Sequence, residues 1–501
     1  MKKQYLYLLF ILVGAVCMTS CESWLDETSN SEIREEDHFS TEVGFRQSLI
    51  GCYINMTDES LYGKELSWGM VETLGRQFQP YTTSASSSNY YIQNYNYKHS
   101  TTVARVENIW AKAYNVIANA NAALAVIDEK ETMMNPTNYS VIKGEFLAIR
   151  AYMHFELMRL YGYGNWAGRK AEIDAKYAVP YVKSVSKNPT DQVKTSEFFK
   201  LLIADLEEAA KYLAEDPVTG KHEWSHYEEL NEDGFYDYRN LHLNYYAVKA
   251  LQARVYLWEG SADSKAKALA AATEVIDDYY TNAASAGTVV RWMGDTDFNS
   301  YPALALEHIF GLNINAERFN NLTAAYLKTA LADTDDDAYY LTNADTYAIY
   351  ENSNTDYRFT KLLQSQLTGI MVGFLPLKLH QTSGAQQLFS YRIPLMRMPE
   401  MYYIAAECHL ANNDVEAALD LLTVVRNQRG VYEELDATMS VEQAMEEVKK
   451  EYHKEFLLEG VMFYYYKRTG ADVLPNMETP MTDAEYVLPY PEFELQNGRI
   501  Q

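Results

Sequence analysis

The feature that most constrains the fold is a predicted pair of helices at residues 397–430. Pro399 suits the first turn of a helix, where its missing N–H costs nothing, and the helix dipole favours Glu400 beside it. Asp414 follows a break and can cap a second helix, which Gly430 ends. The apolar residues of the second helix repeat as one stripe: Val415, Ala418, Leu419, Leu422 and Val425. Such a hairpin cannot bury its stripe alone, so other helices must stack against it.

A second hairpin with the same pattern is predicted at residues 246–278. Ala253 and Leu257 correspond to Ala406 and Leu410 of the first hairpin, with three extra residues in the turn. Each hairpin resembles a tetratricopeptide unit, which is about 34 residues long. We therefore expect a mainly α-helical fold, in which tetratricopeptide-like hairpins form a scaffold that carries long irregular loops and a few short strands.

The composition excludes some classes of partner. The 501 residues include 43 Lys and Arg against 69 Asp and Glu, which gives a formal net charge of −26. This charge argues against nucleic acid as a partner, and against electrostatic binding to anionic lipid surfaces. The 42 tyrosines outnumber the 18 Phe and 7 Trp together. Because tyrosine has an apolar face and a polar tip, this excess suits a wet binding surface.

The N-terminus has the pattern of a bacterial targeting segment. Lys2 and Lys3 precede a short apolar run that is too short for a membrane span. The run closes with small residues before Cys21, which resembles a lipoprotein cleavage box. We expect residues 1–20 to be a lipoprotein signal peptide and Cys21 to carry the lipid, so that the membrane is reached only through this anchor. The alternative is a plain secretory signal with an incidental cysteine.

Of the other cysteines, Cys17 would be removed with the signal peptide. Cys52 and Cys408 are too few and too far apart in the sequence for a disulfide framework. Cys408 lies within the first predicted hairpin, where a small buried apolar role is expected.

Several separated motifs follow one another along the chain: Cys21, Trp24-Leu25-Asp26, Phe39, Glu42, Phe45, Leu49, Gly51 and Tyr53; Gly144-Glu145, Arg150-Ala151, Phe155 and Leu160-Tyr161-Gly162; Asp356-Tyr357-Arg358 and Lys378; Glu451, Glu455, Glu459-Gly460, Phe463 and Lys467-Arg468; and Leu488-Pro489-Tyr490-Pro491. In residues and in order, these motifs resemble those of the SusD-like (RagB/SusD) family. The resemblance covers essentially the whole mature chain. We expect Glu145 and Arg150 to serve packing and ion pairs rather than ligand binding.

The resemblance implies a surface-exposed lipoprotein of the outer membrane that binds a nutrient, most often a glycan. It also implies delivery of that oligosaccharide or other nutrient to a SusC-type TonB-dependent transporter. Residues 21–240 would form a SusD-like N-terminal half. Residues 241–501 would form a RagB/SusD-type C-terminal half that packs with the first as one globular unit.

No catalytic, cofactor or metal motif is recognised. The chain has no G-x-S-x-G, H-E-x-x-H or phosphate-loop sequence, and its ten histidines show no paired metal spacing. Residues 333–337 begin like a calcium loop, but Ala338 and Ala344 stand where glycine and a bidentate glutamate are required. A solvated acidic loop is the better interpretation. Two alternatives to a nutrient-binding protein stay open: a surface glycan hydrolase, and a tetratricopeptide-type scaffold that binds peptides or proteins.

The candidate ligand surface lies in two aromatic segments without helical periodicity, residues 76–97 and 292–320. Aromatic rings stack on the C–H faces of sugars, and polar side chains hydrogen-bond the hydroxyls. The predicted ligand-binding residues are Arg76, Tyr81, Asn89, Tyr90, Tyr91, Trp292, Asp295 and Phe319. Long irregular loops are often functional. The competing interpretation is that these rings cover the helical scaffold, because tyrosine and tryptophan are substantially buried on average.

Overall fold

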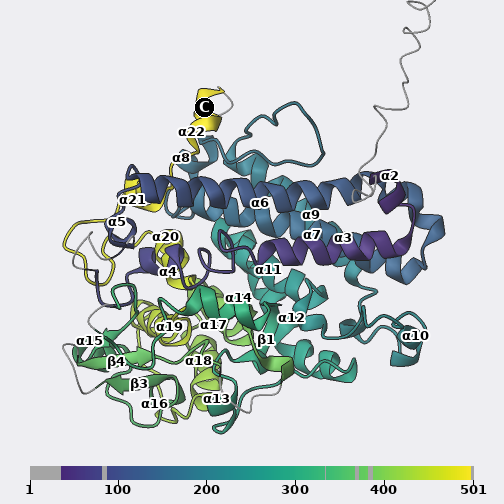
Figure 1. Ribbon diagram of the computed structural model, residues 1–501. Helices are drawn as coiled ribbons and strands as arrows, with labels where there is room; N and C mark the ends of the chain where they lie inside the picture. The colour runs from purple at the N-terminus through teal and green to yellow at the C-terminus, as the bar shows by residue number, and fades with distance from the viewer. Residues whose placement is uncertain are drawn as a thin grey trace, which may run out of the picture.

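The protein is mainly α-helical, with five short strands in the part of the chain that the structure describes (Figure 1). The computed structural model describes residues 35–81, 87, 89–332, 335–366, 372–381 and 387–497. Cys21 and the predicted signal peptide lie outside these residues. The expected fold class is confirmed.

The N-terminal half is built around α7 (Pro136–Tyr161). Asn135 caps its first turn and a proline stands at the start, as the chemistry of helix N-termini favours. Nearly every residue of α7 is buried, so the helix is surrounded by protein on all sides. The other α-helices of this half are α2 (Glu35–His38), α3 (Glu42–Met56), α4 (Met70–Gly75), α5 (Asn89–Gln93), α6 (Ser100–Val126), α8 (Lys170–Ala175), α9 (Thr195–Leu213) and α10 (Trp224–Glu228). Of these, α3, α6 and α9 pack against α7.

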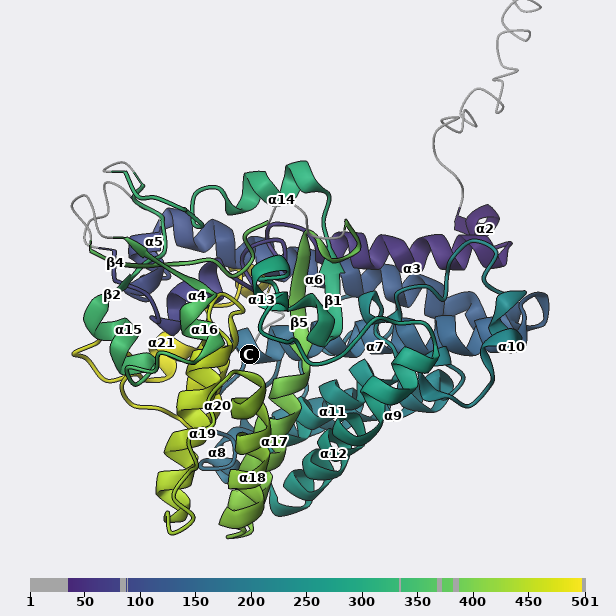
Figure 2. The ribbon, with the colours of Figure 1, turned by 90° about the horizontal axis from the view of Figure 1, so that it is seen from below.

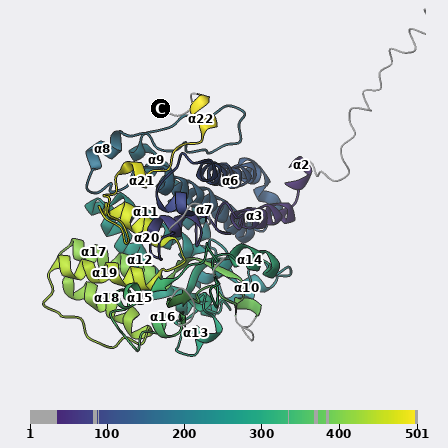
Figure 3. The same cartoon turned by 60° about the vertical axis from the view of Figure 1, so that its left-hand side comes forward.

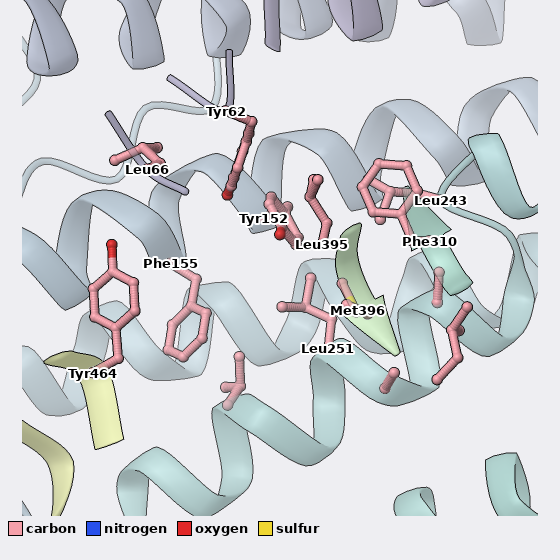
Figure 4. Packing of buried hydrophobic residues seen from close by; sticks show 14 of the residues in the cluster. Tyr62, Leu66, Tyr152, Phe155, Leu243, Leu251, Phe310, Leu395, Met396 and Tyr464 are labelled. Carbon is pink, nitrogen blue, oxygen red and sulfur yellow. The ribbon is translucent and has the colours of Figure 1, made fainter. Parts of the chain in front are cut away.

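The core on both sides of α7 combines rings from distant parts of the sequence (Figure 4). Tyr152 of α7 lies 5.8 Å from the ring of Tyr62 and 6.0 Å from that of Phe310. Phe155, one turn further along, meets Trp258 edge to face. Residues from both halves of the chain therefore belong to one hydrophobic core.

Both predicted hairpins are confirmed. The first along the chain is α11 (Tyr245–Glu259) with α12 (Ala262–Ser285), and the second is α17 (Met398–Ala411) with α18 (Val415–Gln428). Asp414 caps α18, and Gly430 follows it at φ +75°. Helix α12 packs on α17, which also contacts α19 (Val441–Glu455). The last helices are α20 (Val461–Thr469), α21 (Asp483–Tyr486) and α22 (Glu492–Gln496).

Two small antiparallel sheets connect the hairpins. Strand β1 (His308–Asn313) pairs with β5 (Arg392–Arg397), which leads directly into α17. Strand β4 (Gly373–Pro376) lies between β2 (Leu341–Thr342) and β3 (Leu363–Gln366). Four short helices interrupt the same region: α13 (Asp297–Ser300), α14 (Ala316–Thr323), α15 (Asn343–Ile349) and α16 (Tyr357–Thr360).

A buried group of charged side chains joins these elements, and we call it the ion cluster. Its members are Glu307, Asp356, Arg358, Lys378, Arg397, Arg429, Glu451, Glu455 and Glu459. Arg429, at the end of α18, lies 2.6 Å from Glu307 and 2.9 Å from Glu455. Burial opposes its charge, but the two carboxylates outweigh burial and raise the pKa of Arg429 well above its ordinary value.

The motif residues of α7 also form buried ion pairs. Arg150 donates two hydrogen bonds to Asp205 of α9, at 2.7 and 2.8 Å. Glu145 pairs with Arg239 at 2.7 Å. Burial disfavours the Glu145 carboxylate, yet Arg239 and His242 outweigh it and lower the pKa of Glu145 to about 2. Both residues are buried and paired within the protein, as expected of structural positions.

Candidate ligand-binding site

The tyrosine segment, residues 76–97, lies on the side of the molecule opposite the helical hairpins. Figure 2 shows α5 and α14 along one side, and α12, α17 and α18 along the other. The sequence predicts an irregular loop here, but residues 89–93 form the short helix α5, and α6 begins at Ser100. Residues 82–86 and 88 lie outside the described part of the chain.

Arg76 fixes the start of the tyrosine segment. It ends α4 in a left-handed conformation at φ 54°. Its guanidinium donates to the backbone carbonyls of Gln93, Pro475 and Asn476, and burial lowers its pKa. Because these carbonyls engage the guanidinium nitrogens, we assign Arg76 a positioning role, and its predicted role as a ligand contact stays untested.

Tyr81 and Asn89 tie the segment to a second stretch of chain near Asp337. The Tyr81 hydroxyl donates to the Asp337 carbonyl at 3.3 Å, and the Asn89 amide donates to the Asp337 carboxylate at 3.2 Å. Arg105 of α6 donates to the Asn89 side chain at 2.8 Å. Asn89 is fully buried and its polar atoms bond within the protein, so its bond to a ligand hydroxyl stays a prediction.

Tyr90 and Tyr91 are half-exposed, and unlike the equally half-exposed Tyr81 and Tyr95 they are not packed against the hydrophobic core. They lie on consecutive positions of α5 and meet edge to face, with ring centroids 5.6 Å apart. His99 stacks on Tyr91 at 3.5 Å and holds that ring in place. Because one face of Tyr91 is covered by His99, Tyr90 is the ring we test first as a ligand contact.

The second predicted segment does not join the first as one surface. Phe319 is 1% exposed and packs against Trp68 and Tyr391, so its ring faces the core, and its stacking on a ligand stays a prediction. The reason for this burial is the amphipathic helix α14, which turns this ring inward. Trp292 is half-buried against Tyr402 of α17.

Asp295 is exposed near Trp292, and its carboxylate lies 3.2 Å from the Lys361 ammonium. The buried Arg429 guanidinium also lies over the Trp292 ring, 5.6 Å from its centroid. Within the described residues, no ring contact joins Trp292 to the tyrosine segment. The proposed contacts at Trp292 and Asp295 are therefore separate from those at Tyr90.

The far end of the tyrosine segment borders a cavity of about 610 Å³. Tyr95 and Lys98 line one side of it, and Pro489 and Tyr490 of the C-terminal segment line the other. The Tyr97 hydroxyl donates to the carbonyl of Glu485 at 2.6 Å and connects the two sides. Sequence reasoning missed this wall, because no local pattern shows that residues 484–495 return to the start of α6.

No metal-binding group was found in the described part of the chain. The search covered clusters of three or more His, Cys, Asp or Glu side chains. Asp335 pairs with Lys328 at 2.9 Å, whereas residues 333 and 334 of the acidic loop lie outside the described ranges. Cys52 and Cys408 are buried free thiols, and burial raises the pKa of each to about 12.

Among the described helices, none is long and apolar enough to cross a membrane. The predicted anchor at Cys21 lies outside the residues in which this was searched.

The arrangement of helices defines the class of protein. It is similar to that of a SusD superfamily protein from Bacteroides thetaiotaomicron, with a TM-score of 0.71, 21% identity, and coverage of 92% of this chain and 99% of that chain. Surface glycan-binding protein A from the same organism, solved in complex with laminarihexaose, gives a TM-score of 0.65 at 14% identity, with coverage of 92% and 99%.

Sequence comparison places the chain more narrowly. The family model described as "SusD family" matches residues 237–496, more than half of the chain, and the model described as "Starch-binding associating with outer membrane" matches residues 23–227. The chain belongs to the SusD family. SusD-like protein P2 from Formosa agariphila is 26% identical over 224 residues, which cover 42% of this chain and 38% of that relative. The chain thus spans little more than a third of that relative's length.

Proposed function

We propose that the protein is a carbohydrate-binding lipoprotein, and that half-exposed tyrosines on the face opposite the hairpins contact the ligand. The observation that carries this proposal is the placement of Tyr90 and Tyr91 on that face in a member of the SusD family. The laminarihexaose complex of a protein with the same fold supports the ligand class.

The chemistry of the segment agrees with this ligand class. A sugar presents a flat C–H face that an exposed ring can cover, and hydroxyls that need polar partners. Asn94 and Asn96 are exposed near the two rings and supply amide groups. Truncating a ring that stacks in a wet site costs about 1–2 kcal/mol of binding free energy.

The test is calorimetry of Tyr90→Ala with a panel of neutral hexasaccharides: laminarihexaose, maltohexaose, xylohexaose and mannohexaose. We expect wild type to bind at least one of them and Tyr90→Ala to bind it about tenfold more weakly, since 1.4 kcal/mol is one decade. The control is Tyr432→Ala, because Tyr432 is a 71% exposed ring on a different surface. If Tyr90→Ala and Tyr91→Ala both bind like wild type, the tyrosine segment is not the site.

We further propose that the protein delivers its ligand to a SusC-type TonB-dependent transporter, and that a lipid on Cys21 holds it on the outer membrane. The description of the N-terminal family model supports the membrane association. Co-purification of a barrel transporter with the tagged protein tests the partner. Cys21→Ala should move the protein out of the membrane fraction and abolish incorporation of labelled palmitate, and retention of both would refute the anchor.

We propose no catalytic activity. Glu455, which is buried, is engaged in ion pairs with Arg397 and Arg429. Incubation with the bound hexasaccharide should produce no new reducing ends. If reducing ends appear, and persist in a preparation purified to homogeneity, the glycan hydrolase alternative replaces this proposal.

A further inference from the structure

A second cleft lies on the other side of the C-terminal segment from the cavity next to the tyrosines. It has a volume of about 520 Å³, within the range of about 300–1,000 Å³ that is usual for small-molecule sites. Helix α6, the loop of residues 180–190 and the start of α22 enclose it. Figures 1 and 3 both show α22 beside α6, at the end of the chain.

The floor of the cleft is a rigid group of aromatic rings. Trp110 of α6 meets Tyr490 edge to face at 5.5 Å and Tyr161 at 4.9 Å. Tyr114, one turn further along α6, lies 4.9 Å from the Trp110 ring, and its hydroxyl donates to the carbonyl of Pro180 at 2.8 Å. That bond ties the loop to the helix, so the floor and one wall are fixed before any ligand binds.

A large apolar ring lies at the rim. Phe493 of α22 lines the cleft and is 63% exposed. Exposed apolar rings are common on protein surfaces, but Phe493 borders a cleft whose floor is also aromatic. A flat apolar face of a ligand can cover Phe493 while its edge reaches the floor.

The remaining lining is polar, with little positive charge. The loop contributes the hydroxyls of Ser184 and Thr190 and the amide of Asn188, and Glu107 and Glu494 add carboxylates. One Glu107 oxygen already accepts from the backbone N–H of Glu492, at 3.1 Å. Lys187 is the single cation among the described lining residues, so the cleft lacks the paired cations that hold phosphate or carboxylate groups.

We propose that this cleft is a second carbohydrate site, which binds a neutral oligosaccharide by stacking on Phe493 and by hydrogen bonds from the loop. The proposal rests on the proposed function for the class of ligand, but it uses none of the residues of the tyrosine segment. Two sites on one chain raise the avidity for a long polymer, because the second contact becomes intramolecular once the first is made.

The experiment compares hydrogen–deuterium exchange of the full mature chain with and without each hexasaccharide of the panel. Peptides covering residues 180–190 and 490–497 report this cleft, and peptides covering residues 89–99 report the tyrosine segment. We expect protection at both places. Phe493→Ala should abolish protection of residues 180–190 and preserve that of 89–99, and Tyr90→Ala should do the reverse.

Val185→Ala is the matched control, because Val185 is 62% exposed on the same loop but does not line the cleft. It should leave protection at both places unchanged. The proposal is overturned if no hexasaccharide protects residues 180–190 in wild type. It is also overturned if a hexasaccharide protects these residues in Phe493→Ala as strongly as in wild type. Protection of this cleft by a lysine-rich peptide alone would also overturn it, since the ligand would then be cationic. If a hexasaccharide protects residues 180–190 but not residues 89–99, the result contradicts only the proposed site at the tyrosine segment.

Discussion

The ion cluster and the tyrosine segment use polar side chains in opposite ways. In the ion cluster, Arg397 and Arg429 are fully buried, and both reach Glu455. In the tyrosine segment, Tyr90 and Tyr91 keep part of their surface in water. The ion cluster contains the motif residues Asp356, Arg358, Lys378, Glu451, Glu455 and Glu459, whereas the tyrosine segment contains no motif residue. The residues that identify the family and those that we propose contact the ligand therefore lie in different parts of the chain.

The physical reason lies in the cost of burial. Removing one partner of a buried ion pair leaves an uncompensated charge, so every member constrains the others. Truncating an exposed ring leaves no uncompensated charge, because water occupies the space that the ring leaves. We expect changes in the ion cluster to lower stability, and changes at exposed rings of the tyrosine segment to lower affinity alone.

The largest effect is expected from Arg429→Met. This change leaves the Glu307 and Glu455 carboxylates short of a partner in a buried position, and should lower the free energy of unfolding by about 3–5 kcal/mol. Chemical denaturation measures it. Arg291→Met is the control, because Arg291 pairs with Asp297 while 54% of its side chain is exposed, and the loss should stay below about 1 kcal/mol. Equal losses in the two variants would contradict the comparison.

The next effect tests the apolar stripe that the sequence predicts. Leu422 of α18 is fully buried, so Leu422→Ala should lower the free energy of unfolding by about 2–5 kcal/mol. Val424 is two residues away and 38% exposed, so Val424→Ala should change it by less than about 0.5 kcal/mol. Thermal denaturation of both variants checks the pair. A loss below about 0.5 kcal/mol for Leu422→Ala would mean that the stripe is not packed.

The hairpins were predictable because a helix repeats its apolar residues locally, and Asp414 and Gly430 mark the ends of α18. The ion cluster was not predictable as a cluster, because its members come from residues 307–459 and meet only in the folded chain. The burial of Phe319 and Asn89 was not predictable for the same reason: exposure depends on what covers a segment.

The third prediction concerns Glu72, a carboxyl group of α4 at the base of the tyrosine segment. It accepts from the backbone N–H of Gly460 at 2.9 Å and from Gln77 at 3.1 Å. Burial raises the pKa of Glu72 to about 7, although hydrogen bonds from Leu458 and Gly460 partly oppose the shift. Between its ordinary value of 4.5 and about 7, the folded protein keeps a proton that the unfolded chain has lost.

Stability should therefore fall as the pH rises through this window, by about 3–4 kcal/mol at 1.36 kcal/mol per pKa unit. Glu72→Gln mimics the protonated group and removes this contribution. We expect the variant and wild type to have similar stability at pH 4.5, and the variant to be more stable at pH 8. Denaturation at the two pH values measures the difference, and an equal pH dependence in both proteins would contradict the assignment.

The smallest effect on stability is expected from Tyr90→Ala. Its ring is half-exposed and meets Tyr91 edge to face, and Tyr91 keeps its own stacking on His99 when Tyr90 is truncated. Little buried surface is lost, so the free energy of unfolding should change by less than about 0.5 kcal/mol while the affinity for a hexasaccharide falls about tenfold. If the rings of this segment merely cover the scaffold, the opposite follows: lost stability with unchanged affinity. Denaturation and calorimetry on the same preparation distinguish the two interpretations, because each one predicts which of stability and affinity falls and which stays unchanged.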